Sequence, residues 1–225
     1  MSGAPPPGCA LAVIAKQPVP GLVKTRLAGR FGPGGAARAA AAMLADTLAT
    51  VRTVGAAPWL CYAPAEAGAA MAALAPGFGL MAQRGGGLGP RLAACVRDLL
   101  AGGAERVAVV GADTPQLPAA TYVDAFERLD EHDVVLGPAL DGGYYLVALK
   151  TWTPDLFSGV RMGTATVLAE TIALATAAGR RVGLLAPARD LDRPGDLAAA
   201  LDDGELATSP ATAAVAAELL AGALP

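Results

Sequence analysis

Short apolar runs alternate with longer Ala- and Leu-rich stretches of helical periodicity along most of the chain. The runs that predict strands lie at 10–15, 59–62, 106–110, 133–136, 144–149 and 182–185, with a weaker candidate at 79–82. Helical patterns fall at 35–54, 65–74, 89–101, 119–129, 164–178 and 194–201, with a last helix near 209–224. This alternation predicts an α/β fold in which crossover helices flank a mostly parallel sheet.

The runs at 133–136 and 144–149 break the alternation, because only GPALDGG and no helix separates them. We therefore expect an antiparallel insertion, and hence a mixed sheet. No polar linker divides the 225 residues, which predicts a single domain over 1–225. Residues 1–8, which include a run of three prolines, are predicted to form a flexible or extended tail.

The composition argues against a membrane protein and against a nucleic-acid-binding protein. Hydrophobic residues make up 54% of the chain but aromatic residues only 4%, and no stretch reaches the roughly 20 apolar residues of a membrane span. Because the N-terminus also lacks the charged region of a secretory signal, we expect a soluble, cytoplasmic protein with no membrane partner. A net charge of −3 gives no footprint for nucleic acid, which favours a small-molecule substrate and leaves the oligomeric state open.

The cysteines and the histidine exclude several kinds of site. Cys9, Cys61 and Cys95 lie far apart in apolar surroundings, so we expect buried side chains and neither a zinc site nor a disulfide framework. His132 is the only histidine and lies in a polar turn, and there is no G-x-S-x-G motif. Serine-hydrolase chemistry is therefore not supported.

A basic segment follows the first predicted strand, where ligands bind in open α/β sheets. The sequence AKQPVPGLVKTRL brings Lys16, Lys24 and Arg26 to one strand end, within an irregular loop that contains Gly21. Three cations suit a polyphosphate, and Lys24 and Arg26 would face the same side if this part is extended. A solvated basic loop is the alternative, and no Walker motif is present.

Two later segments carry carboxylates at strand ends. Asp113 follows the apolar run at 106–110 in the sequence Gly-Ala-Asp, which predicts a ligand for a hard divalent cation. The alternative is that Asp113 caps the next helix. Asp190 and Asp192 flank a leucine after the last strand, so both could reach one cation or a pair, whereas Asp196 is better explained as a helix cap.

Asp141 begins the Asp-Gly-Gly turn between two strands, where the glycines allow either close approach of a ligand or a simple hairpin. Of the tyrosines that follow, Tyr144 and Tyr145, one or both could face the core or the substrate.

A glycine-rich loop with Gln83, Gly89 and Arg91 could bring backbone N–H groups to a base or a phosphate, although such a loop is nonspecific by itself.

Four motifs occur in order over residues 15–197: A-K-x-P-x-P-G-x-V-K-T-R-L, G-A-D-x-P-x-L, G-P-A-x-D-G-G-Y-Y-L and D-L-D-x-P-x-D-L. Together they resemble the DUF2064 family, whose fold is GT-A-like, as in nucleotide-diphospho-sugar transferases. That family is often labelled glycosyltransferase and includes a branch associated with arsenosugar biosynthesis. It is also similar to the guanylyltransferases of coenzyme F420 and molybdenum cofactor biosynthesis.

The resemblance implies that Lys24 and Arg26 hold nucleotide phosphates, while Asp113, Asp190 and Asp192 hold magnesium or manganese. The chain departs from the family at Gly87, where an acidic residue usually precedes Leu-Gly, and at Met162, where a tryptophan usually precedes Gly-Thr.

Three functions compete. The first is nucleotidyl transfer from a nucleoside triphosphate to a phosphate, phosphonate, arsonate or carboxylate, with Lys24, Arg26 and the metal stabilising the departing pyrophosphate. The second is sugar transfer from a nucleotide-sugar, in which Asp113 holds the metal and Asp141 acts on an acceptor hydroxyl. The third is noncatalytic nucleotide binding.

Overall fold

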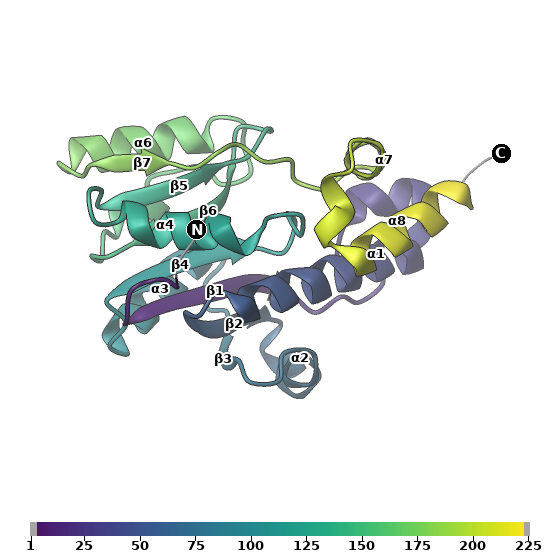
Figure 1. Cartoon of the computed structure of the whole chain (residues 1–225), viewed down its shortest axis with the longest axis horizontal. Coiled ribbons are helices and arrows are strands. Elements are labelled where there is room, and N and C mark those ends of the chain that lie inside the picture. Colours follow the sequence, from purple (N-terminus) through teal and green to yellow (C-terminus); the bar gives the residue numbers. More distant parts are fainter. Residues whose placement is uncertain (1–3, 223–225) are drawn as a thin grey trace.

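The computed structural model describes residues 4–222, and one seven-stranded sheet runs through the centre of the chain (Figure 1). The strand order is β3-β2-β1-β4-β6-β5-β7, and only β6 runs antiparallel to its neighbours. The strands are β1 (Cys9–Lys16), β2 (Ala57–Ala63), β3 (Gly79–Ala82), β4 (Arg106–Gly111), β5 (Val134–Pro138), β6 (Tyr144–Leu149) and β7 (Val182–Leu184).

Helices cover both faces of this sheet. Apolar side chains of α1, α2 and α4 pack on one face, and those of α3, α5 and α6 pack on the other. The helices are α1 (Thr25–Thr53), α2 (Gly68–Leu74), α3 (Leu88–Ala101), α4 (Ala119–Arg128), α5 (Asp155–Ser158), α6 (Val167–Ala177), α7 (Pro194–Asp202) and α8 (Pro210–Ala221), with short 3-10 turns at Ala65–Ala67 and Glu205–Thr208.

The predicted α/β class and mixed sheet are confirmed. The chain reverses between β5 and β6 through residues 139–143, where Gly142 has a φ of 91°. A Cβ at this glycine would lie 2.1 Å from the carbonyl oxygen of Ala165, so close packing requires glycine here. The predicted strands at 79–82 and 144–149 have the observed bounds.

The start of the first helix was predicted wrongly, at residue 35 instead of Thr25. The helix is kinked at Gly32, which has a φ of 70°, and at Pro33. The helical pattern of apolar residues can therefore be recognised in the sequence only after these two residues. The segment before the kink is held by tertiary packing, since Leu27 is fully buried and Phe31 packs beside it against α7 and α8. The short helix α5 was not predicted either.

The helices α7 and α8, with the first half of α1, form a helical layer beyond the carboxyl end of β1 (Figure 1). Asp46, in the second half of α1, connects this helix to α8. Asp46 is 6% exposed, and its carboxylate accepts hydrogen bonds from the backbone N–H groups of Ala211 (3.3 Å) and Thr212 (2.7 Å). Asp46 thus caps the N-terminus of α8 from another helix.

The ends of the chain lie partly outside the described residues. Of the predicted tail at 1–8, residues 1–3 are not described, whereas Pro5 is buried and the carbonyl of Gly8 accepts a hydrogen bond from Glu105. The predicted last helix ends at Ala221, and residues 223–225 are likewise not described.

Within residues 4–222, no helix is both long and apolar enough to cross a bilayer. The three cysteines are buried, as predicted.

Candidate active site

A pocket of about 770 Å³ opens at the carboxyl ends of β1 and β4. The loops after β1, β4, β5 and β7 meet there because these four strands run in the same direction. Four cationic and four acidic side chains line the pocket. All eight are residues singled out in the sequence: Lys16, Lys24, Arg26, Arg91, Asp113, Asp141, Asp190 and Asp192.

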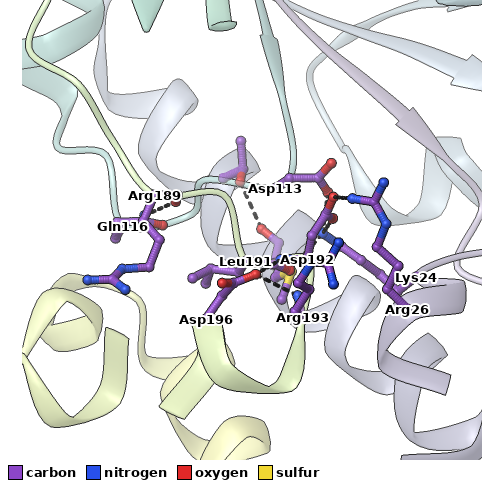
Figure 2. Close-up of polar contacts among 11 residues, drawn as sticks. Lys24, Arg26, Asp113, Gln116, Arg189, Leu191, Asp192, Arg193 and Asp196 are labelled. Carbon is purple, nitrogen blue, oxygen red and sulfur yellow. Dashed lines mark hydrogen bonds and ion pairs between the residues drawn. The ribbon is translucent and has the colours of Figure 1, made fainter. Parts of the chain in front are cut away.

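Lys24 is the centre of this charge cluster. Its side chain is only 7% exposed, and its Nζ lies 2.8 Å from Asp113 Oδ1 and 2.8 Å from Asp192 Oδ1. The ammonium also donates to the carbonyl of Leu191 at 2.9 Å. Arg26 approaches the second oxygen of Asp192 at 3.1 Å, and Figure 2 shows both cations meeting these carboxylates.

The backbone at Lys24 is not extended, which corrects the geometry that the sequence suggested. Lys24 has left-handed dihedrals (φ 46°, ψ 47°) and is the N-cap of α1, and Arg26 lies in the first helical turn. Within residues 4–222, Lys24 is the only non-glycine residue with positive φ. That conformation costs about 1 kcal/mol. The ion pairs offset this cost, and the helical turn brings both cations to Asp192.

Backbone contacts hold the segment that carries Asp190 and Asp192. The N–H of Leu191 donates to the carbonyl of Asp113 at 2.8 Å, and the Leu191 side chain is fully buried in the helical layer. Because side chains alternate along extended backbone, burying Leu191 turns the two carboxylates toward the pocket. Asp196 accepts from the N–H groups of Asp192 and Arg193 and caps α7, as predicted.

The acidic side chains differ in their electrostatic surroundings. Burial, followed by repulsion from Asp113, Asp141 and Asp192, raises the pKa of Asp190 to about 7. Burial would also raise the pKa of Asp192, but Lys24 and Arg26 outweigh it and lower that pKa. Conversely, burial would lower the pKa of Lys24, yet its two carboxylate partners raise it. Lys24 therefore stays charged.

The donor chemistry of this cluster fits a hard divalent cation, because carboxylate oxygens are the ligands that magnesium prefers. Within the described residues, however, no group of three or more His, Cys, Asp or Glu side chains is arranged to hold a metal. Asp113 and Asp192 point instead to Lys24, so their role as metal ligands stays a prediction.

Asp113 does not cap the following helix, because the N-cap of α4 is Pro118 and no side chain caps it.

Asp141 lines the pocket and also closes its own turn, because its Oδ1 accepts a hydrogen bond from the N–H of Gly143 at 2.8 Å. Both tyrosines after this turn line the pocket, and they have different polar partners. Tyr145 is 5% exposed and donates to the carbonyl of Ala186, whereas the half-buried Tyr144 contacts the sulfur of Met162.

Gln83 acts on the backbone of the pocket wall. Its Nε2 donates to the carbonyls of Ala15 and Cys61, both at 2.8 Å, and its Oε1 accepts from Arg91 at 3.2 Å. Gln83 thus joins the ends of β1 and β2 and orients a pocket cation.

Replacing Gln83 by leucine is expected to destabilise the fold by about 2 kcal/mol, because two strand-end carbonyls lose their donor. Urea unfolding measures this loss. The control is Arg91→Met, which keeps both backbone bonds and should cost less than about 1 kcal/mol. An equal loss in the two variants would contradict the backbone role of Gln83.

Two predicted ligand glycines do not line this pocket. Gly21, with a φ of 82°, forms a turn before Lys24. Gly89 is buried, and a Cβ there would lie 2.4 Å from the carbonyl oxygen of Phe157. Gly89 therefore allows α3 to pack closely on α5, which is a structural reason for glycine.

Other pocket residues were not foreseen as site residues. Leu22 and Leu88 are 63% and 48% exposed at the pocket, and Met162 and Thr164 line its wall. The hydroxyl of Thr114 is buried beside Asp113, lines the pocket, and has no partner among the described residues. Exposed leucines and a lone threonine carry no sequence signal of function, so only the fold could identify them.

Comparison with solved structures finds a close match in a candidate nucleotide-diphospho-sugar transferase from Desulfovibrio desulfuricans. It is 31% identical to this chain, with a TM-score of 0.89 over 95% of this chain and 96% of its own. This similarity confirms the GT-A-like fold that the resemblance to DUF2064 implied.

More distant structures share the fold alone. A CMP:2-keto-3-deoxy-manno-octonic acid synthetase complexed with CTP is 12% identical, with a TM-score of 0.56 over 90% of this chain and 98% of its own. A 4-diphosphocytidyl-2C-methyl-D-erythritol synthase from Anaerococcus prevotii is 13% identical, with a TM-score of 0.52 over 80% of this chain and 87% of its own.

No curated protein matches the sequence. The sequence profile of DUF2064, described as an uncharacterized protein conserved in bacteria, matches residues 46–164. Because this match covers more than half of the chain, the chain belongs to the DUF2064 family.

Proposed function

We propose that this chain is a magnesium-dependent nucleotidyltransferase that acts on a small anionic acceptor. The observation that carries the proposal is the joining of four cations and four carboxylates in one pocket of the size that small-molecule sites have. The fold supports the broader class of nucleotide-using transferase, since structures that share it include a candidate nucleotide-diphospho-sugar transferase and a synthetase with bound CTP.

The proposed reaction is displacement at the α-phosphorus of a nucleoside triphosphate. An oxyanion of the acceptor forms a new P–O bond, and the bond between the α-phosphorus and the bridging oxygen breaks. The electron pair leaves with pyrophosphate. The acceptor is a phosphate, phosphonate, arsonate or carboxylate, so no proton has to be removed before attack. This agrees with a pocket that contains no histidine.

The cations of the pocket would bind and orient the phosphates. Arg26 is 56% exposed and faces the pocket from the first turn of α1, where backbone N–H groups also favour an anion. Lys16 and Arg91 line the same pocket and add charge that a triphosphate needs. Lys24 would reach the phosphates once it leaves its carboxylates.

Asp113 and Asp190 are the residues that we expect to hold magnesium, with Asp192 as a third ligand. When bound, magnesium would offset the negative charge that develops on the phosphates. Asp192 also orients Lys24 and Arg26, so it acts on the cations whether or not it touches the metal.

Sugar transfer from a nucleotide-sugar is the second candidate, and the match to the Desulfovibrio desulfuricans protein favours it. In that reaction Asp141, which lines the pocket, would accept the proton of an acceptor hydroxyl. Noncatalytic nucleotide binding is a third candidate, which would require the carboxylate cluster to serve stability alone.

The test is a thermal-unfolding screen of the full chain with the four NTPs and several nucleotide-sugars, each with and without magnesium. A ligand that binds only the native state raises the unfolding midpoint. We expect one NTP with magnesium to do so, and incubation with candidate acceptors to release pyrophosphate. Stabilisation by a nucleotide-sugar alone, with release of a nucleoside diphosphate, would support sugar transfer. Binding without turnover across all acceptors would favour the noncatalytic function.

A further inference from the structure

The ammonium of Lys24 has three polar partners within the protein. The ammonium donates to Asp192 Oδ1 at 2.8 Å and to the carbonyl of Leu191 at 2.9 Å, and it forms an ion pair with Asp113 Oδ1 at 2.8 Å. Because the side chain is 7% exposed, little of it is left for a ligand. In this arrangement Lys24 does not reach a phosphate, and it occupies the two carboxylates that would serve a metal.

Lys24 therefore stands where a bound cation would stand. It bridges carboxylates from two separate loops, one after β4 and one after β7. Asp192 also meets Arg26, but among the described residues Asp113 pairs only with Lys24. A divalent cation needs the same oxygens and is repelled by an ammonium beside it. The two cations should exclude each other.

We propose that Lys24 is a built-in counter-ion that keeps the carboxylate site closed to metal until a polyphosphate draws it away. The inference rests on the proposed function, because it assumes that the pocket takes a polyphosphate together with a divalent metal. Metal binding then depends on nucleotide binding, and the same lysine moves from the carboxylates to the phosphates. This coupling disfavours occupancy of the site by metal alone.

The position of Lys24 allows such an exchange. The residue lies at the junction between the loop and α1, in the left-handed backbone conformation that non-glycine residues rarely adopt. Its flexible stem carries a compact charge, and both the pocket and the carboxylates lie within its reach. Oxyanions of a polyphosphate would replace the carboxylates as partners of the ammonium, so the lysine would not lose its counter-charge.

The proposal makes opposite predictions for two ligands, the metal alone and the metal with a polyphosphate. Removing Lys24 should strengthen binding of Mn²⁺ alone, since a competing charge is gone. The same change should weaken binding of the Mn²⁺ complex of inorganic tripolyphosphate, since a phosphate contact is lost. A lysine with a purely structural role would change both affinities in the same direction or neither.

The experiment is calorimetric titration of the full chain with Mn²⁺, and separately with manganese tripolyphosphate. We expect Lys24→Met to bind Mn²⁺ about tenfold more tightly than the wild type and manganese tripolyphosphate about tenfold more weakly. Lys16→Met is the matched control. It removes the same charge from the same pocket, but within residues 4–222 Lys16 forms no ion pair with a carboxylate, so its Mn²⁺ affinity should stay within about threefold of the wild type.

Circular dichroism checks that each variant is folded, and Lys24→Gln, which keeps a donor for the Leu191 carbonyl, replaces Lys24→Met if the methionine variant does not fold. If the folded Lys24 variant bound Mn²⁺ no more tightly than the wild type, the counter-ion role of Lys24 would be overturned. That result, with tight binding of manganese tripolyphosphate by the wild type, would leave the proposed function standing. If the wild type binds no manganese tripolyphosphate, the proposed function fails as well.

Discussion

Replacing Asp113 by asparagine is expected to lower metal-dependent turnover by about a thousandfold. The side chain lies just after the carboxyl end of β4, 2.8 Å from the ammonium of Lys24 and near the half-buried Asp190. Asparagine keeps the shape but removes a charged ligand and one of the two carboxylate partners of Lys24. Pyrophosphate release, with the NTP identified by the thermal screen, measures the effect.

The fold should survive this change, because the Asp113 side chain is 52% exposed and one repulsion on Asp190 is relieved. The control is Asp124→Asn on α4, which removes a carboxylate from an exposed pair with Arg128 outside the pocket. Its turnover should stay within about twofold of the wild type. Turnover within about threefold of the wild type in Asp113→Asn would exclude Asp113 as a metal ligand.

Replacing Asp46 by alanine is expected to destabilise the fold by about 3 kcal/mol. The carboxylate is buried and accepts from the first-turn amides of α8 at 2.7 and 3.3 Å. Alanine leaves these amides without an acceptor and without the charge that favours a helix N-terminus. Urea unfolding, with the slope compared between variants, measures the difference.

The chain offers a matched control in Glu218→Ala. Glu218 also connects α8 to α1, through Arg38, but both side chains are more than half exposed. Its loss should cost less than about 1 kcal/mol. If Asp46→Ala were no more destabilising than Glu218→Ala, the cap would not contribute as its burial implies.

The Asp46 variant also tests how the helical layer supports the pocket. Leu191, which orients Asp190 and Asp192, is buried in that layer with residues of α7 and α8. Loosening α8 should therefore weaken nucleotide binding in conditions where the protein remains folded, although Asp46 does not line the pocket.

Local patterns in the amino-acid sequence were enough to predict the fold class and the positions of most helices and strands. Apolar strands and amphipathic helices are local patterns, and GPALDGG between two strands was enough to predict a mixed sheet. The same local reasoning placed the charged residues of the site, because parallel strands direct the loops at their carboxyl ends to one edge of the sheet. Asp113, Asp141, Asp190 and Asp192 indeed line one pocket.

The contacts of these residues, by contrast, depend on how distant parts of the chain pack together. Lys24 and Asp192 are 168 positions apart, and no spacing in the sequence shows that they form an ion pair. Gln83 is bound to the ends of two strands, and Gly89 packs on Phe157, for reasons that depend on neighbours remote in the chain. The start of α1 before Gly32 likewise depends on packing against α7 and α8. The spacing of hydrophobic residues in the sequence indicates which side of a helix or strand is buried. The partners of a charged side chain depend instead on how the helices and strands pack together.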